Sequence, residues 1–148
     1  MEYQIAPIKF LDINPDSKFS DFKAGHVGIR TNKIDELLKW YEKNLDFRII
    51  KRWNVGDIRL AFMASPADND FIIEVICYDR NEKYTDGLKS GYNHLSFWVD
   101  SLSKTTKELE KNGIPIQRSF SVPEIAMTVA FIDDTFGNSI ELCQKMTD

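Results

Sequence analysis

The chain has 148 residues, of which 43% are hydrophobic and 12% aromatic, and a formal net charge of −4 at pH 7. This length and apolar content suit one compact domain, or two half-size modules that share a core. The negative charge and scattered lysines offer no basic surface for nucleic acid, so we expect a small-molecule partner.

The start of the chain and its cysteines indicate a compartment. The first residues lack the basic start and apolar core of a signal peptide, and no apolar run approaches membrane-spanning length. Cys77 and Cys143 lie in apolar, strand-like runs and are typical of reduced thiols. We therefore expect a soluble cytoplasmic protein that needs no disulfide and no membrane.

Residues 1–22 form an expected N-terminal arm, because a turn-like segment, 14–18, separates them from an internal repeat. Apolar side chains of the arm could pack over the domain or on a partner subunit. They are Ile5, Ile8, Phe10 and Leu11. We assign no chemistry to them.

Two strand-like segments with a histidine mark the repeat. His26 lies in the segment 25–31 and His94 in the segment 92–99, so the histidines are 68 positions apart. The residues after each histidine also match at this offset. The matching pairs are Ile34 with Leu102, Glu42 with Glu110, Lys43 with Lys111, and Asn44 with Asn112.

Each copy also ends on an apolar run that contains a glutamate, Glu74 in the first and Glu141 in the second. The repeat therefore predicts a single domain, 23–145, built from one module over 23–78 and another over 91–145. A polar linker, 79–90, would join them.

In chain order, each copy indicates a strand, a helix and three further strands. In the first copy, Asn32 is the expected N-cap of a helix that ends near Asn44. The further strands are expected at 47–53, 58–65 and 71–78, and the second copy repeats the plan with a helix over 102–111 and strands near 115–120, 125–133 and 138–144. One βαβββ unit leaves a sheet face uncovered. Pairing two units predicts an α+β fold with a curved mixed sheet around a concave site.

Side chains alternate across a strand, so the neighbours of a residue indicate where it points. Ile140 and Leu142 point away from Glu141, and Leu95 points away from His94. We expect this apolar face to meet the helices. The other face would then line a hollow that is partly shielded from water.

Carboxylates inside apolar strands are costly unless they are paired, hydrogen-bonded or bound to a metal. Neutral imidazole and carboxylate suit a borderline divalent ion such as Zn²⁺, Ni²⁺, Co²⁺, Mn²⁺ or Fe²⁺. The sequence therefore predicts one metal ion held by His26, Glu74, His94 and Glu141. The alternative is that the glutamates face solvent on the wet side of an antiparallel sheet.

These four residues and the closing segment 130–142 resemble the vicinal oxygen chelate superfamily, over roughly residues 24–145. Glyoxalase I, methylmalonyl-CoA epimerase, extradiol dioxygenases and bleomycin-binding proteins belong to it. The His, Glu, His, Glu pattern is most similar to that of glyoxalase I. The resemblance implies the paired βαβββ fold and the same four metal ligands.

The resemblance to glyoxalase I further implies a metal-dependent lyase or isomerase. Such an enzyme moves a proton between adjacent carbons of a small oxygenated substrate through an enediolate, with Glu141 or Glu74 as the base. Glutathione or another thiol would be the co-substrate, with Arg30 at the position of an arginine that binds a glutathione carboxylate. Tyr78 stands where glyoxalase I tends to have an asparagine. Tyr78 and Trp98 are candidate substrate contacts or wall residues.

Alternatives stay open on the same scaffold. The protein could be a metal-dependent epimerase, a ferrous dioxygenase with two histidines and one glutamate, or a metal-free protein that sequesters a small molecule. We also expect a homodimer. Its sites could take all four ligands from one chain or one His–Glu pair from each chain.

Overall fold

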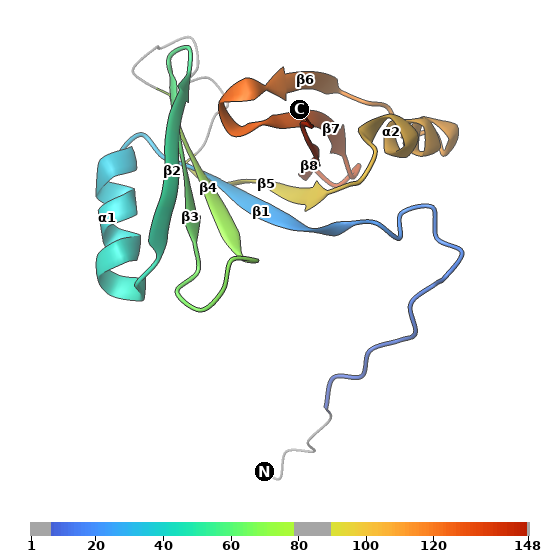
Figure 1. Ribbon diagram of the computed structural model, residues 1–148, viewed down its shortest axis with the longest axis horizontal. Coiled ribbons are helices and arrows are strands. Elements are labelled where there is room, and N and C mark those ends of the chain that lie inside the picture. Colours follow the sequence, from blue (N-terminus) through green and yellow to red (C-terminus); the bar gives the residue numbers. More distant parts are fainter. Residues whose placement is uncertain (1–6, 79–89, 148) are drawn as a thin grey trace.

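The computed structural model describes residues 7–78 and 90–147 (Figure 1). All of the expected linker except Ser90 lies outside these residues, as do the first six residues of the expected arm, Ile5 included. The elements in chain order are β1 (Lys23–Arg30), α1 (Ile34–Leu45), β2 (Arg48–Val55), β3 (Ile58–Ala64), β4 (Ile72–Tyr78), β5 (Gly91–Trp98), α2 (Leu102–Lys111), β6 (Arg118–Val122), the 3₁₀ turn η2 (Pro123–Ile125), β7 (Met127–Asp133) and β8 (Ser139–Lys145).

The strands form one mixed eight-stranded sheet in the order β2-β3-β4-β1-β5-β8-β7-β6. β1 pairs in parallel with β4, and β5 pairs in parallel with β8. The antiparallel pair β1·β5 joins the two halves. The sheet curls, with α1 outside one half and α2 outside the other (Figure 1). The expected α+β fold of two βαβββ units in a curved mixed sheet is confirmed.

The outer face of each half packs on its own helix. Val75, next to Glu74, belongs to a buried cluster with Ile34 and Leu38 of α1. Leu142, next to Glu141, packs in the same way with Leu102 of α2. The apolar neighbours of both glutamates thus point toward the helices, which leaves the glutamates on the concave face.

The concave face has its own apolar cluster, to which both halves contribute. Its buried members are Trp53, Phe62, Met127, Val129, Phe131 and Cys143. These side chains separate the centre of the concave face from solvent, so any polar group there lies in a surrounding of low polarity.

Two local predictions were wrong. α1 begins at Ile34 with Lys33 as its N-cap residue, rather than Asn32, because the Thr31 hydroxyl accepts the Lys33 backbone N–H at 3.0 Å and the chain turns there first. The strand expected from residue 125 begins only at Met127, because Pro123 starts the turn η2 and Ala126 ends it with a left-handed φ of 51°. This turn brings residues 122–125 to the open side of the sheet, where they line a cavity.

The described part of the arm, residues 7–22, leads away from the sheet (Figure 1). Its far end exposes Ile8, Phe10 and Leu11 almost fully. Nearer the domain, Phe22 packs against Phe97 with ring centroids 5.5 Å apart. No helix in the described ranges is both long and apolar enough to cross a membrane.

Candidate metal centre and substrate cavity

Four adjacent strands at the middle of the sheet place the four predicted ligands together. Glu74 comes from β4, His26 from β1, His94 from β5 and Glu141 from β8. All four side chains are buried, with 2–6% of their surface exposed. A single chain therefore supplies the whole cluster.

The donor atoms converge. The Nε2 atoms of His26 and His94 lie 2.9 Å apart, and the carboxylate oxygens of Glu74 and Glu141 lie 3.5–3.8 Å from these nitrogens. One donor atom from each residue lies within 4.8 Å of all the others. Ligands about 2.1 Å from a common ion are about 3.0 Å apart at right angles and about 4.2 Å apart when opposite. The cluster therefore has the size and donor types of a divalent metal site.

His94 is held in the form that a metal ligand needs. Its Nδ1 donates a hydrogen bond to Asn93 Oδ1 at 2.8 Å, which leaves the Nε2 lone pair facing the cluster. Asn93 reaches its own neighbour because the β1·β5 ladder is irregular there: Gly28 pairs with His94, while Ile29 pairs with Tyr92. Asn93 is the extra residue of this bulge.

Gly28 makes room for His94. It lies opposite Glu74 in the β1·β4 ladder and opposite His94 in the β1·β5 ladder. A Cβ at this position would collide with the His94 imidazole. A side chain here would push one ligand out of the cluster.

Both histidines are neutral at neutral pH. Burial lowers the pKa of His26 to about 3, and the neighbouring His94 adds to the effect. Burial also lowers the pKa of His94 to about 4, with a smaller contribution from the positive charge of Arg118. Neutral imidazole is the form that binds a metal ion.

Burial opposes the charged form of both carboxylates, and a bound cation would stabilise that form. Burial raises the pKa of Glu141 to about 7, although the Cys143 thiol, which donates to Glu141 Oε1 at 2.7 Å, and Arg118 oppose this rise. Burial also raises the pKa of Glu74 well above its usual range, and the nearby Glu141 raises it further. A divalent ion would counteract both shifts, because a nearby positive charge favours the ionised carboxylate.

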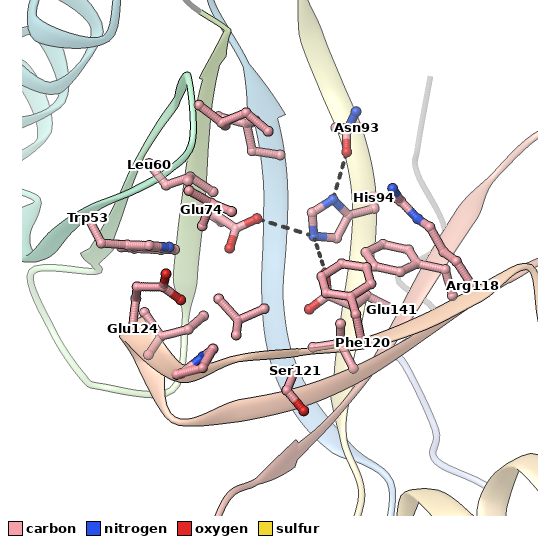
Figure 2. Close-up of a pocket in the computed structure, with 18 of the residues that line it drawn as sticks. Trp53, Leu60, Glu74, Asn93, His94, Arg118, Phe120, Ser121, Glu124 and Glu141 are labelled. Carbon is pink, nitrogen blue, oxygen red and sulfur yellow. Dashed lines mark hydrogen bonds and ion pairs between the residues drawn. The ribbon is translucent and has the colours of Figure 1, made fainter.

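A cavity of about 250 Å³ opens onto this cluster (Figure 2). Glu74, His94 and Glu141 line it, together with aromatic and aliphatic side chains from both halves of the sheet. Besides the three ligands, its polar lining residues are Tyr78, Asn93, Arg118, Ser121 and Glu124. Ligand pockets of roughly 300–1,000 Å³ are typical, so this one suits a small molecule or the reacting end of a larger one.

The other predicted contacts lie at different distances from this cavity. Tyr78 lines it. Arg30 is buried beside Tyr78, with its guanidinium carbon 4.2 Å from the ring centroid, and does not line this cavity. Trp98 is also not part of its lining; the Lys145 ammonium lies 5.2 Å from the Trp98 ring centroid. Substrate binding by these residues stays a prediction.

Reasoning from sequence missed Asn93, Arg118 and Trp53. Strict alternation places Asn93 on the face away from His94, so only the bulge could have revealed it. Arg118 and Trp53 lie in strands with no motif. Gly28 did carry a signal, because the equivalent position in the second copy is Ser96 and both lie on the face of the histidines.

The chain is similar to curated enzymes over most of its length. A probable lactoylglutathione lyase of Synechocystis sp. is 24% identical over 123 residues, which cover 80% of this chain and 92% of that protein. An Arabidopsis thaliana protein named Glyoxylase I 4 is 29% identical over 122 residues, which cover 80% of this chain and 68% of that protein.

Solved structures share the fold. Methylmalonyl-CoA epimerase from Mycobacterium tuberculosis superposes with a TM-score of 0.75 at 21% identity, over 91% of this chain and 94% of that one. A family model matches residues 23–142, which include the four clustered residues and both halves of the sheet. The chain thus belongs to the Glyoxalase/Bleomycin resistance protein/Dioxygenase superfamily.

Proposed function

We propose that the protein is a metal-dependent lyase or isomerase of the glyoxalase I type that acts on a small oxygenated substrate. The observation that carries the proposal is the convergence of two neutral histidines and two buried carboxylates beside a small cavity. Zn²⁺, Ni²⁺, Co²⁺, Mn²⁺ and Fe²⁺ all accept such ligands. The lactoylglutathione lyase named among the relatives supports the same reaction type.

The proposed roles follow from how each side chain is held. A bound divalent ion would polarise substrate oxygens and stabilise negative charge next to the reacting carbon. Within the described part of the chain, Glu74 accepts no hydrogen bond, whereas Glu141 accepts the Cys143 thiol proton. We therefore assign Glu74 the task of taking a proton from one carbon and returning it to the next, with Glu141 as the alternative base.

Epimerisation of an acyl thioester is the second candidate, and it needs the same proton transfer. The solved epimerases of this fold support it, and so does a cavity that can take an acyl group while the rest of a thioester stays outside. A ferrous dioxygenase needs only one carboxylate, and a metal-free binding protein needs neither histidine. The two buried carboxylates therefore favour proton transfer.

Glutathione or another thiol is the proposed co-substrate of the lyase reaction. We also propose a homodimer, because Ile8, Phe10, Leu11 and Tyr92 leave large apolar side chains exposed. Sedimentation of the full chain and of a chain lacking residues 7–13 would test the dimer and the part that the arm takes in it.

The test begins with elemental analysis of the purified protein. We expect about one divalent ion per chain, lost from His26→Ala and His94→Ala. The loaded protein is then assayed with the hemithioacetal of methylglyoxal and glutathione, and with methylmalonyl-CoA.

Glu74→Gln should lower turnover of the better substrate by about 10²–10⁴ while part of the metal stays bound. Full turnover in Glu74→Gln would move the base to Glu141. A protein that takes up no Zn²⁺, Ni²⁺ or Mn²⁺ would contradict the proposed function.

A further inference from the structure

The cavity contains a buried hydrogen-bond donor that the proposed reaction does not use. Trp53 is 8% exposed and lines the cavity. Its Nε1 has no hydrogen-bond partner within residues 7–78 and 90–147. A buried N–H without an acceptor is unfavourable, and such groups are rare in folded proteins.

The ring that carries this donor is held firmly. Trp53 packs on Phe62 with ring centroids 4.6 Å apart, and Phe62 in turn lies 5.4 Å from the His26 ring. Figure 2 shows the nitrogen-bearing edge of Trp53 directed into the cavity, toward Glu74. The donor is therefore fixed in place, one aromatic ring away from the metal ligands.

We propose that Trp53 Nε1 donates a hydrogen bond to the substrate, and so selects substrates with an acceptor oxygen beyond those that reach the metal. This inference rests on the proposed function for the position of the substrate. Arg118 lies on the opposite side of the cavity and is close enough to His94 and Glu141 to shift both pKa values. Its positive charge makes the cavity as a whole more favourable for an anionic substrate, and a carboxylate also offers an acceptor oxygen to Trp53 Nε1.

The rival explanation is that Glu124 satisfies Trp53 in solution. Glu124 lies in the turn η2, lines the same cavity and is drawn beside Trp53 in Figure 2. A carboxylate from the substrate would have to take the position that Glu124 would otherwise use. The experiment must therefore separate these two acceptors.

Two matched probes isolate the extra oxygen. Acetohydroxamate and N-hydroxyoxamate share the hydroxamate group that chelates zinc, and the second carries a carboxylate in place of the methyl group. We expect the zinc-loaded protein to bind N-hydroxyoxamate more tightly in calorimetry. Trp53→Phe keeps the aromatic packing, and should lower this preference about tenfold without changing the affinity for acetohydroxamate.

The matched control is Trp40→Phe, the same change on α1 at a side chain that is 55% exposed. It should alter neither affinity. An unchanged preference in Trp53→Phe would overturn the proposal.

A second readout follows the Trp53 N–H directly and needs no turnover. The indole N–H resonances of the ¹⁵N-labelled protein are assigned with the two variants, and the Trp53 signal should move downfield with N-hydroxyoxamate and stay in place with acetohydroxamate. If the protein binds no zinc, the proposed function fails, and the same titration of the metal-free protein decides the role of Trp53. A Trp53 signal that responds to Glu124→Ala and to neither probe would overturn the inference.

Discussion

The two halves of the molecule hold the same pair of ligands in different ways. In the second half, His94 donates to Asn93, and Glu141 accepts from Cys143, whose sulfur lies 3.2 Å from the Ser96 hydroxyl. The equivalent positions of the first half are Gly25, Ile76 and Gly28, and none of them has a polar side chain.

Both copies of the repeat thus contain the His and Glu ligands, but among the residues that the structure describes only the second half has polar side chains that hydrogen-bond to them. The second half fixes the orientation of its ligands, and the first half provides space and freedom. Because Glu141 is held by the Cys143 thiol and Glu74 has no such support within residues 7–78 and 90–147, Glu74 is the better candidate for a carboxylate that moves during a reaction.

The largest effect is expected when a side chain is added at Gly28, in the first half, where the His94 ring needs the space. Gly28→Ala places a Cβ against the His94 ring, and we expect it to abolish metal binding and to lower the free energy of unfolding by about 1–3 kcal/mol. Ser96→Ala is the matched change in the other half and should cost at most about 1 kcal/mol. Metal analysis and urea unfolding measure both effects. Normal metal content in Gly28→Ala would show that His94 is not confined as described.

Removing the support of His94 should have the next largest effect. Asn93→Ala frees Nδ1 and should weaken metal binding by about 10–100-fold, as measured by competition with a chelator. Asn93→Asp keeps an acceptor oxygen and should recover most of the affinity. If alanine and aspartate behave alike, the hydrogen bond does not orient the ring.

Metal affinity should also depend on pH. Because burial raises the pKa of Glu141 to about 7, the incoming ion must displace a proton below that pH. We expect the affinity to fall by at least about tenfold for each pH unit below 7, because Glu74, whose pKa burial also raises, adds to the effect. Titrations by calorimetry in buffers of different ionisation enthalpy would measure the released proton. Affinity that is constant between about pH 5 and 8 would contradict a raised pKa.

The free energy of unfolding of the metal-free protein should also depend on pH, through Glu141 and the two histidines. The folded protein holds the Glu141 proton up to about pH 7, while the unfolded chain loses it near 4.5, so this group makes stability fall as pH rises. The histidines act in the opposite sense, but only below 6.5, their unfolded pKa. Between about pH 6.5 and 7 the melting temperature of the metal-free protein should therefore decrease, with Glu74 acting in the same direction, and bound metal should abolish the decrease.

The smallest effect is expected at the thiol that supports Glu141. Cys143→Ala removes a donor worth about 1 kcal/mol and should weaken metal binding about fivefold, whereas Cys143→Ser keeps a donor. Cys77→Ala is the control, because this equally buried thiol packs in the α1 cluster on the other face of the sheet. Equal effects of the two alanine variants would assign Cys143 to packing alone.

The repeat was enough to predict the fold and the convergence of His26, Glu74, His94 and Glu141. A 68-residue offset between the histidines and a 67-residue offset between the glutamates place these residues in equivalent strands and on a common face. Alternation within each strand then determines which neighbours meet the helices. These inferences use only chain periodicity, which the sequence records directly.

Asn93 and Trp53 could not be predicted because neither follows that periodicity. Asn93 reaches His94 through a bulge that breaks the alternation, and Trp53 reaches the cavity through the curvature of the whole sheet. The turn η2 was also missed. The residues from Pro123 to Ile125 carry no pattern that separates a short 3₁₀ turn from the start of the next strand. Each depends on contacts between distant segments.

The β1·β5 ladder, which joins the halves and contains two irregularities in register, has a consequence for how the molecule opens. It pairs residues that are 61 to 75 positions apart, so we expect it to form late in folding and to belong to a less protected cooperative unit than the β2–β3 hairpin. An ion with ligands on both sides of the ladder would tie the halves together. Amide hydrogen exchange in β1 and β5 should then slow on metal binding far more than exchange in β2. The exchange rates of these amides would therefore report how firmly the metal holds the two halves together.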